Sequence, residues 1–171
     1  MWGFKIGYNS GNINNLINDI QLLKPTFFGS FPMFFNKIYD KVNEKIKEYP
    51  APISKLINFA IESKIWYFHN FGIINHYIYD IIVFSFMKKV LGGQIRIFVS
   101  GGAPLSSEVK YFLTVVFCSP IFEAYGMTEA AGCCSTTAYW ERRGGHVGGI
   151  LPCLRMHLRD VNELNCQTDA D

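Results

Sequence analysis

The sequence is poor in charged residues, and neither sign dominates. Charged side chains make up 18% of the 171 residues, and 16 Lys and Arg against 14 Asp and Glu leave a formal net charge of +2. Binding nucleic acid or an acidic membrane through charge needs a clustered basic excess. The Lys-rich stretch 37–47 also contains Asp40 and Glu44, which is typical of the solvated face of a helix. We therefore expect no nucleic acid among the partners.

Cysteine is scarce and irregularly spaced. The five cysteines include no Cys-x-x-Cys pair, and Cys133 and Cys134 are adjacent, which makes a mutual disulfide geometrically awkward. The four histidines show no metal-ligand spacing, so a zinc site is not expected. The pattern predicts buried, reduced thiols in an intracellular protein.

A signal peptide and a long apolar run are also missing. Met1 is followed by Trp-Gly-Phe-Lys and not by a basic stretch and an apolar block. The most apolar run, 73–90, is interrupted by Asp80, Lys88 and Lys89, and is too polar and too short to span a bilayer. What the sequence does have is 49% apolar and 16% aromatic residues, enough for a substantial core within one domain or part of one.

The first half is predicted to be mostly helical. Apolar residues recur at helical spacing in four stretches, and Pro50, Pro52, Gly72 and the pair Gly92-Gly93 separate or end them. The predicted elements are a helix over 12–22, a buried strand over 26–30, and helices over 32–48, 53–70 and 76–90.

The second half has a different pattern. A strand over 94–99, a turn over 100–104, a helix from Ser106 or Ser107 to Phe117 and a strand over 120–125 make a βαβ unit, with one of the two serines as the helix cap. Such a unit predicts an α/β fold with a parallel sheet. Ligands of open sheets bind beyond the carboxyl ends of the strands, where 101–104 and 126–129 fall.

The residues of these two loops suit a phosphate ligand. Paired glycines allow a flat ligand to approach the backbone, and a Thr hydroxyl beside a Glu carboxylate offers a phosphate donor and a hard ligand for magnesium. Each feature alone is weak, because a Gly-Gly pair is usually only a tight turn and a Thr-Glu pair is often a helix N-terminus.

Three ordered segments resemble the motifs of one superfamily. Residues 125–129 read Tyr-Gly-Met-Thr-Glu, residues 100–105 read Ser-Gly-Gly-Ala-Pro-Leu, and residues 145–152 read Gly-His-Val-Gly-Gly-Ile-Leu-Pro. They are similar to the Tyr-Gly-x-Thr-Glu, Ser-Gly-Gly-Ala-Pro-Leu and Gly-x-Val-Gly-x-x-x-Pro motifs of the adenylate-forming, AMP-binding superfamily. The resemblance implies part of that superfamily's large N-terminal domain, an α/β fold with a mixed or parallel sheet flanked by helices.

The first half resembles one branch of that superfamily. Residues 23–26, Leu-Lys-Pro-Thr, and residues 31–41, Phe-Pro-Met-Phe-Phe-Asn-Lys-Ile-Tyr-Asp-Lys, resemble a stretch of eukaryotic long-chain fatty-acyl-CoA synthetases. Met33 departs from that pattern, since it stands where the family has Arg. The resemblance covers essentially the whole chain and divides it into a mostly helical segment, 1–92, and a nucleotide-site segment, 93–171, of one partial domain.

The resemblance implies a reaction and a role for each matching residue. Members convert a long-chain fatty acid and MgATP to an acyl-adenylate and pass the acyl group to the co-substrate CoA. Thr128 would bind a phosphate and Glu129 would hold Mg²⁺, and this pair is the predicted catalytic machinery. The predicted nucleotide-binding residues are Gly101, Gly102, Ala103, Pro104, Tyr125, Gly126, Met127 and Thr128.

The resemblance also implies what lies outside these residues. The family's phosphate loop, ribose-binding Asp, C-terminal lid domain and catalytic Lys do not match any part of the sequence, so the 171 residues alone are expected to be inactive. The parent enzyme is expected at the cytosolic face of the endoplasmic reticulum or of another organelle membrane, attached through other segments. Two alternatives stay open: another acid–CoA or adenylating ligase, and a noncatalytic remnant that binds acyl groups or partners.

Overall fold

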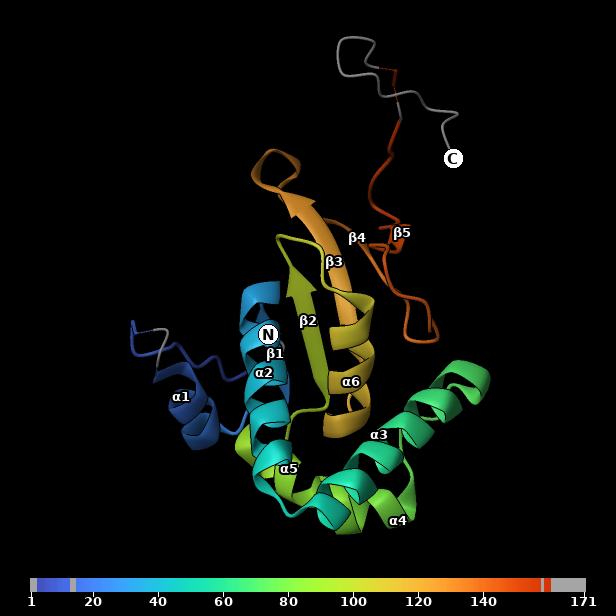
Figure 1. Cartoon of the computed structure of the whole chain (residues 1–171). Coiled ribbons are helices and arrows are strands. Elements are labelled where there is room, and N and C mark those ends of the chain that lie inside the picture. Colours follow the sequence, from blue (N-terminus) through green and yellow to red (C-terminus); the bar gives the residue numbers. More distant parts are fainter. Residues whose placement is uncertain (1–2, 13–14, 158, 161–171) are drawn as a thin grey trace.

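The computed structural model describes residues 3–12, 15–157 and 159–160, and its strands form one five-stranded sheet in the order β1-β2-β3-β4-β5 (Figure 1). Strands β1 (Phe27–Ser30), β2 (Ile97–Gly101) and β3 (Ile121–Met127) are parallel, whereas β4 (Gly132–Thr136) and β5 (Gly149–Ile150) pair antiparallel with their neighbours. Helix α6 (Ser107–Phe117) connects β2 to β3. The predicted βαβ unit and α/β class are therefore confirmed, and the sheet is mixed.

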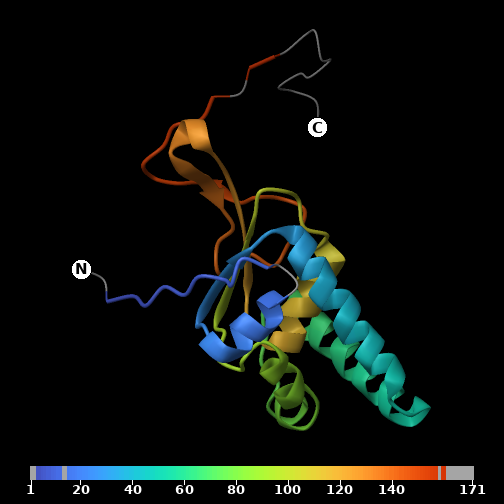
Figure 2. The ribbon, with the colours of Figure 1, turned by 90° about the vertical axis from the view of Figure 1, so that its left-hand side faces the viewer.

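Three helices lie on one side of this sheet. Helices α2 (Pro32–Glu48), α3 (Ala51–Phe71) and α6 gather on the same side of the strands (Figure 2). The burial of β2 alternates accordingly: Phe98 and Ser100 are buried beneath the helices, whereas Val99 on the opposite face is only half-buried. The sheet thus has one face packed by helices and one face that the described helices leave more open.

Phenylalanine builds the core between the sheet and the helices. The ring of Phe98 on β2 meets Phe35 of α2 and Phe117 of α6 edge to face, with ring centroids 5.9 Å and 5.8 Å apart. Such tilted aromatic pairs contribute about 0.5–1.5 kcal/mol beyond the area that they bury. The high aromatic content is therefore used in part to fill this layer.

Helix α2 shows why its predicted boundaries are confirmed. Pro32 occupies the first helical turn, where its missing N–H needs no partner, and the chain leaves the helix at Tyr49 before Pro50. Its buried face is Phe34, Phe35, Ile38, Val42 and Ile46. The charged side chains of 37–47 point to solvent, as predicted. One partly buried contact joins the helix to α6, where Tyr39 Oη donates to Glu108 Oε1 at 2.7 Å and this hydrogen bond raises the pKa of Tyr39.

Several predicted elements need correction. Strand β1 is not buried, since its burial alternates and Phe27 is 61% exposed, because it pairs with β2 on one side only within the described sheet. The strand predicted from Gln94 begins at Ile97, because the Ile95 carbonyl accepts a hydrogen bond from Ser119 Oγ instead of joining the ladder. Ser106 precedes α6 but makes no capping hydrogen bond through its side chain.

The remaining helices also depart from the predicted pattern. Helix α1 spans Leu16–Leu23, and the predicted helical positions Ile13 and Asn14 lie outside the described residues, as does the stretch 161–171 of the predicted nucleotide-site segment. The predicted helix over 76–90 consists of α4 (Tyr77–Tyr79), a π-helical turn η2 (Asp80–Phe84) and α5 (Ser85–Val90). The wider turn begins at Asp80, whose carboxylate is held from the inside of the fold.

A buried ion pair holds Asp80. Lys64 of α3 is 1% exposed, and its ammonium donates to Asp80 Oδ1 and to the Val115 carbonyl, both at 2.6 Å, and to Cys118 Sγ at 3.1 Å. Burial by itself raises the pKa of Asp80, but the hydrogen bonds from Lys64 and Cys118 outweigh it and hold that pKa below its ordinary value. Burial raises the pKa of the Cys118 thiol, so this cysteine stays protonated and donates to Asp80 at 3.2 Å.

The cysteines match the prediction only in part. Cys118, Cys133, Cys134 and Cys153 are free thiols among the residues that the structure describes, as expected for a reduced protein. Cys134 is buried, but Cys133 and Cys153 are exposed, which corrects the expectation of buried thiols. Within the described ranges, no group of three His, Cys, Asp or Glu side chains could hold a metal ion.

Candidate nucleotide site

The three motif segments meet in one row across the sheet. The strand registers pair Gly101 with Ala124, Ala124 with Thr136, and Thr136 with Gly149. Strands β2 and β3 point to the same end of the molecule, where the β3–β4 hairpin projects beyond the sheet (Figure 1). The structure therefore brings the segments 101–104, 125–129 and 145–149 to one edge, the carboxyl edge of the parallel strands.

The turn after β2 requires glycine at its centre. Gly102 has a φ of 86°, a left-handed conformation that L side chains rarely adopt, and an added Cβ would lie 3.1 Å from the Phe31 ring. Ala103 and Pro104 follow, and both are exposed. The intramolecular contact with Phe31 thus explains this glycine before any ligand is considered. Phe31 is 67% exposed and follows β1, so the sequence analysis missed a flat apolar side chain at the same edge.

The second segment is only partly a loop. Tyr125, Gly126 and Met127 continue β3, which corrects the expectation that the strand ends at Tyr125. The ladder with β4 shifts register between Tyr125 and Gly126. Beyond this irregularity, Thr128–Ala130 form a single 3₁₀ turn. Tyr125 keeps 42% of its surface exposed, so one side of its ring is open to a stacking partner.

Thr128 and Glu129 stand free at the tip of the hairpin. Both are exposed, and no hydrogen bond or ion pair joins either side chain to another residue that the structure describes. A free hydroxyl and a free carboxylate side by side are suited to bind a phosphate and a magnesium ion. Magnesium usually takes one or two carboxylates and completes its shell with phosphate oxygens and water, so the single Glu129 carboxylate fits such an ion.

The glycine at 126 is fixed by the hairpin itself. An added Cβ would collide with the carbonyl group of Gly132 and approach the Cα of Cys133 to 2.9 Å. Gly126→Ala is therefore expected to lower the free energy of unfolding by about 1–3 kcal/mol, measured by urea denaturation. Gly149→Ala is the matched control, because its Cβ would meet nothing within 4 Å, and it is expected to change stability by less than about 0.5 kcal/mol. Equal effects of the two changes would contradict this reading of the hairpin.

The third segment is fastened to helix α6. The Gly144 amide donates to Tyr111 Oη at 2.7 Å, and Lys110 Nζ donates to the Arg143 carbonyl at 3.2 Å. Glu141 accepts hydrogen bonds from the Arg143 side chain, which lower the pKa of Glu141 to about 2. His146 accepts from the Gly148 amide through Nδ1 at 3.0 Å. These contacts set the course of the chain towards β5 and the row of paired residues.

A buried ion pair lies beneath the edge. Lys110 of α6 and Glu123 of β3 are 3% and 6% exposed at the side chain, and Lys110 Nζ lies 2.9 Å from Glu123 Oε1. The Glu123 amide also donates to Thr137 Oγ1 at 3.0 Å. The pair ties the helix after the first motif segment to the strand that carries the second. The sequence analysis did not single out either residue, because nothing in the chain marks a lysine and a glutamate thirteen positions apart as partners.

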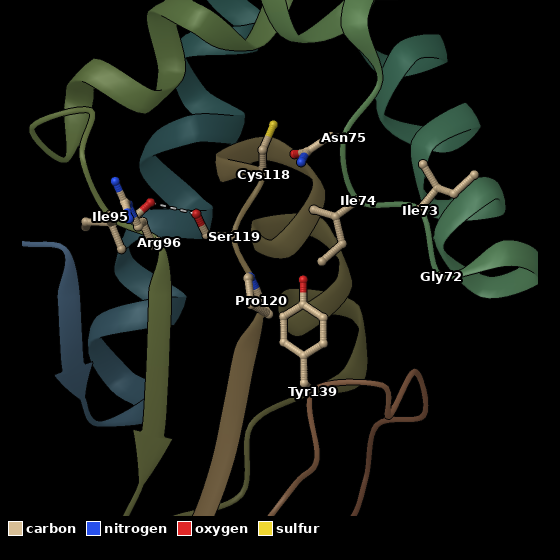
Figure 3. Close-up of a pocket in the computed structure, with 10 residues that line it drawn as sticks. All are labelled: Gly72, Ile73, Ile74, Asn75, Ile95, Arg96, Cys118, Ser119, Pro120 and Tyr139. Atoms are coloured by element: carbon tan, nitrogen blue, oxygen red, sulfur yellow. Dashed lines mark hydrogen bonds between the residues drawn. The ribbon is translucent and has the colours of Figure 1, made fainter.

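A cavity of about 430 Å³ lies at the opposite edge of the sheet. It opens between Ile74, Asn75, Arg96, Cys118 and Tyr139 (Figure 3). Since Arg96 precedes β2 and Pro120 precedes β3, the cavity adjoins the amino ends of these strands, away from the predicted nucleotide-binding residues. It is therefore not part of the candidate site.

The fold and the site define an α/β domain of the adenylate-forming type. The A domain of a carboxylic acid reductase from Segniliparus rugosus, solved with AMP and a carboxylic acid, superposes with a TM-score of 0.51 at 20% identity over 75% of this chain and 17% of that one, a likeness of fold. The chain belongs to the AMP-binding enzyme family, whose profile matches residues 1–170.

The curated relatives narrow the family to one branch. The chain is 39% identical over 164 residues to mouse long-chain-fatty-acid–CoA ligase 5, covering 95% of this chain and 24% of that protein. It is 34% identical over 167 residues to Arabidopsis thaliana long chain acyl-CoA synthetase 7, peroxisomal, covering 98% of this chain and 24% of that protein. The chain thus resembles long-chain-fatty-acid–CoA ligases along almost its whole length and spans about a quarter of theirs.

Proposed function

We propose that the complete protein containing these residues activates long-chain fatty acids to acyl-CoA through an acyl-adenylate. The observation that carries the proposal is the meeting of three motif segments at one sheet edge, in a chain whose relatives are long-chain-fatty-acid–CoA ligases. In the first step a carboxylate oxygen of the fatty acid bonds to the α-phosphorus of ATP and pyrophosphate leaves. In the second step the CoA thiol loses its proton, its sulfur bonds to the acyl carbon, and AMP leaves with the bridging oxygen.

Each site residue has a role that its position supports. The exposed ring of Tyr125 stacks on adenine, while the turn formed by Gly102, Ala103 and Pro104 lines the adenine side, with Gly101, Gly126 and Met127 completing the strand ends. Thr128 Oγ1 donates to a phosphate, and the Glu129 carboxylate holds Mg²⁺. The ion supplies charge neutralisation at the phosphates, which is what phosphoryl and nucleotidyl transfer requires.

The proposed activity belongs to the complete enzyme and not to this chain alone. Residues 1–92 supply the helical layer and the edge strand β1, and residues 93–171 supply the site edge. A triphosphate also needs cationic and backbone donors, which the resemblance places in a phosphate loop and a C-terminal lid with its Lys. We further propose an organelle membrane as the location, in keeping with the name of the Arabidopsis relative.

A substrate screen separates this proposal from its nearest alternative. With ATP and CoA, the complete protein is expected to release AMP in the presence of palmitate and at least about tenfold less with benzoate, because a pocket for a long apolar chain gains about 0.8 kcal/mol for each buried methylene. Preference for benzoate would assign an aromatic-acid ligase. Binding of fatty acid without AMP release would assign the noncatalytic remnant.

A further inference from the structure

The helical segment 77–90 is apolar on its outer side as well as on its inner side. Phe84 is fully buried and Met87 is 7% exposed, so the inner side packs into the core. The outer stripe consists of Tyr77, Ile78, Ile81, Ile82 and Phe86, which are between 54% and 82% exposed. A helix that is apolar all round is normally buried in a core or in a membrane. The outer stripe is thus a surface that lacks a partner within the described structure.

The fold holds this stripe outward. The π-helical turn η2 begins at Asp80, the only carboxylate in 77–90, and Lys64 draws that carboxylate inward through the bond at 2.6 Å. The stripe therefore presents apolar groups and no negative charge of its own segment. Ser85, which is exposed between them, returns its hydroxyl to the Ile81 carbonyl at 2.8 Å. Its polar group is thereby satisfied within the helix.

Positive charges border the stripe. Lys88 and Lys89 lie in the last turn of α5, and Lys45 Nζ of α2 lies 5.8 Å from the centre of the Phe86 ring. An apolar stripe with aromatic rings and flanking lysines is the pattern of a helix that lies in the headgroup region of a bilayer. Anionic lipid attracts each such lysine by about 1 kcal/mol.

We propose that the outer stripe is a membrane-docking surface for a bilayer that contains anionic lipid. The segment is too short to cross a bilayer, which takes about 20 apolar residues, and no helix within the described ranges is long and apolar enough to do so. A second copy fits less well, because two-fold pairing of the same face would bring the lysines of both copies together. This inference goes beyond the proposed ligase activity and does not depend on it.

Docking through this surface leaves the candidate nucleotide site open. Helices α4 and α5 lie at the end of the molecule opposite to the β3–β4 hairpin (Figure 1). With the outer stripe in the headgroup region, the edge that carries Thr128 and Glu129 faces away from the bilayer. Water-soluble nucleotides would then reach the site from the aqueous side.

Vesicle co-sedimentation of the complete protein tests the proposal. The wild type is expected to bind vesicles of phosphatidylcholine with about one-third phosphatidylserine. The triple variant Ile78→Ser, Ile82→Ser, Phe86→Ser should lower the partition coefficient at least about tenfold. Ile150→Ser, which changes an exposed isoleucine of β5, is the matched control and should leave binding unchanged. Lys89→Gln should weaken binding to these vesicles about fivefold and leave binding to pure phosphatidylcholine unaltered.

Three results would overturn the proposal. Equal vesicle binding by the wild type and the triple variant would place the membrane contact elsewhere. Absence of binding by a monomeric wild type would mean that another part of the complete protein covers the stripe. Light scattering that shows a dimer in the wild type and a monomer in the triple variant, without vesicle binding, would make a second copy the occupant. Since no readout involves acyl-CoA, failure of the ligase proposal would leave this test intact.

Discussion

Replacing Glu129 by alanine is expected to reduce acyl-CoA formation by the complete protein at least about 100-fold. Glu129 is exposed at the hairpin tip without a partner among the described residues, so its removal disturbs no contact that holds the fold. What is lost is the carboxylate that the proposal assigns to Mg²⁺. The measurement is the initial rate of palmitoyl-CoA formation at saturating palmitate, ATP and CoA.

A matched control separates this effect from a loss of charge in general. Glu62→Ala removes another exposed carboxylate from helix α3, far from the hairpin, and should leave the rate within about twofold. The two variants should also unfold at the same urea concentration as the wild type. A Glu129→Ala enzyme with normal turnover would remove this residue from the proposed site.

Lys64→Ala is expected to lower the free energy of unfolding by about 3–5 kcal/mol. The change deletes an ammonium that is 1% exposed and leaves Asp80, whose side chain is 13% exposed, without its cation. It also removes the cation that lies 4.5 Å above the Phe84 ring. Since domains are stable by only about 5–15 kcal/mol, this single change should bring the protein close to unfolding. Urea denaturation followed by circular dichroism measures the loss.

Two further variants make that result specific. Lys55→Ala removes an exposed lysine of the same helix and should cost less than about 0.5 kcal/mol. The double variant Lys64→Met, Asp80→Leu removes both charges and should be more stable than Lys64→Ala, because no buried charge is left unpaired. If Lys64→Ala were as stable as Lys55→Ala, the buried pair would have no role in holding the π-helical turn.

The boundaries of α2 and the βαβ unit follow from local signals in the sequence. Pro32 and Pro50 fix the ends of α2 through their missing N–H groups and fixed backbone angle, without help from tertiary contacts. Apolar residues at helical spacing between them define the buried face. In the second half, the alternation around Phe98 and the change to helical spacing after Ser106 are equally local.

The buried ion pairs could not be predicted in the same way. Lys64 and Lys110 each stand on an amphipathic helix, where a lysine is normally solvated, and their partners are set by the packing of separate elements. The π-helical turn at Asp80 inserts an irregularity that a 3.6-residue period does not reveal. Strand β1 appeared buried because its residues are aromatic, yet its exposure depends on its place at the edge of the sheet.

For the candidate site, the sequence predicted the segments but not their supports. The register that aligns Gly101, Ala124, Thr136 and Gly149 depends on how four strands pair. The necessity of Gly102 and Gly126 arises from contacts with Phe31 and with the Gly132 carbonyl, both outside the motifs. Assignment of nucleotide and metal roles to these residues stays a prediction based on the family.

Transfer of oxygen from the fatty acid to AMP tests the central claim most directly. The complete protein would be given palmitate labelled with ¹⁸O in its carboxylate, together with MgATP and CoA, and the products analysed by mass spectrometry. An acyl-adenylate intermediate predicts one ¹⁸O atom in each AMP released with palmitoyl-CoA, because the bridging oxygen leaves with the phosphate. Label in inorganic phosphate alongside ADP, or palmitoyl-CoA formed with unlabelled AMP, would contradict the account.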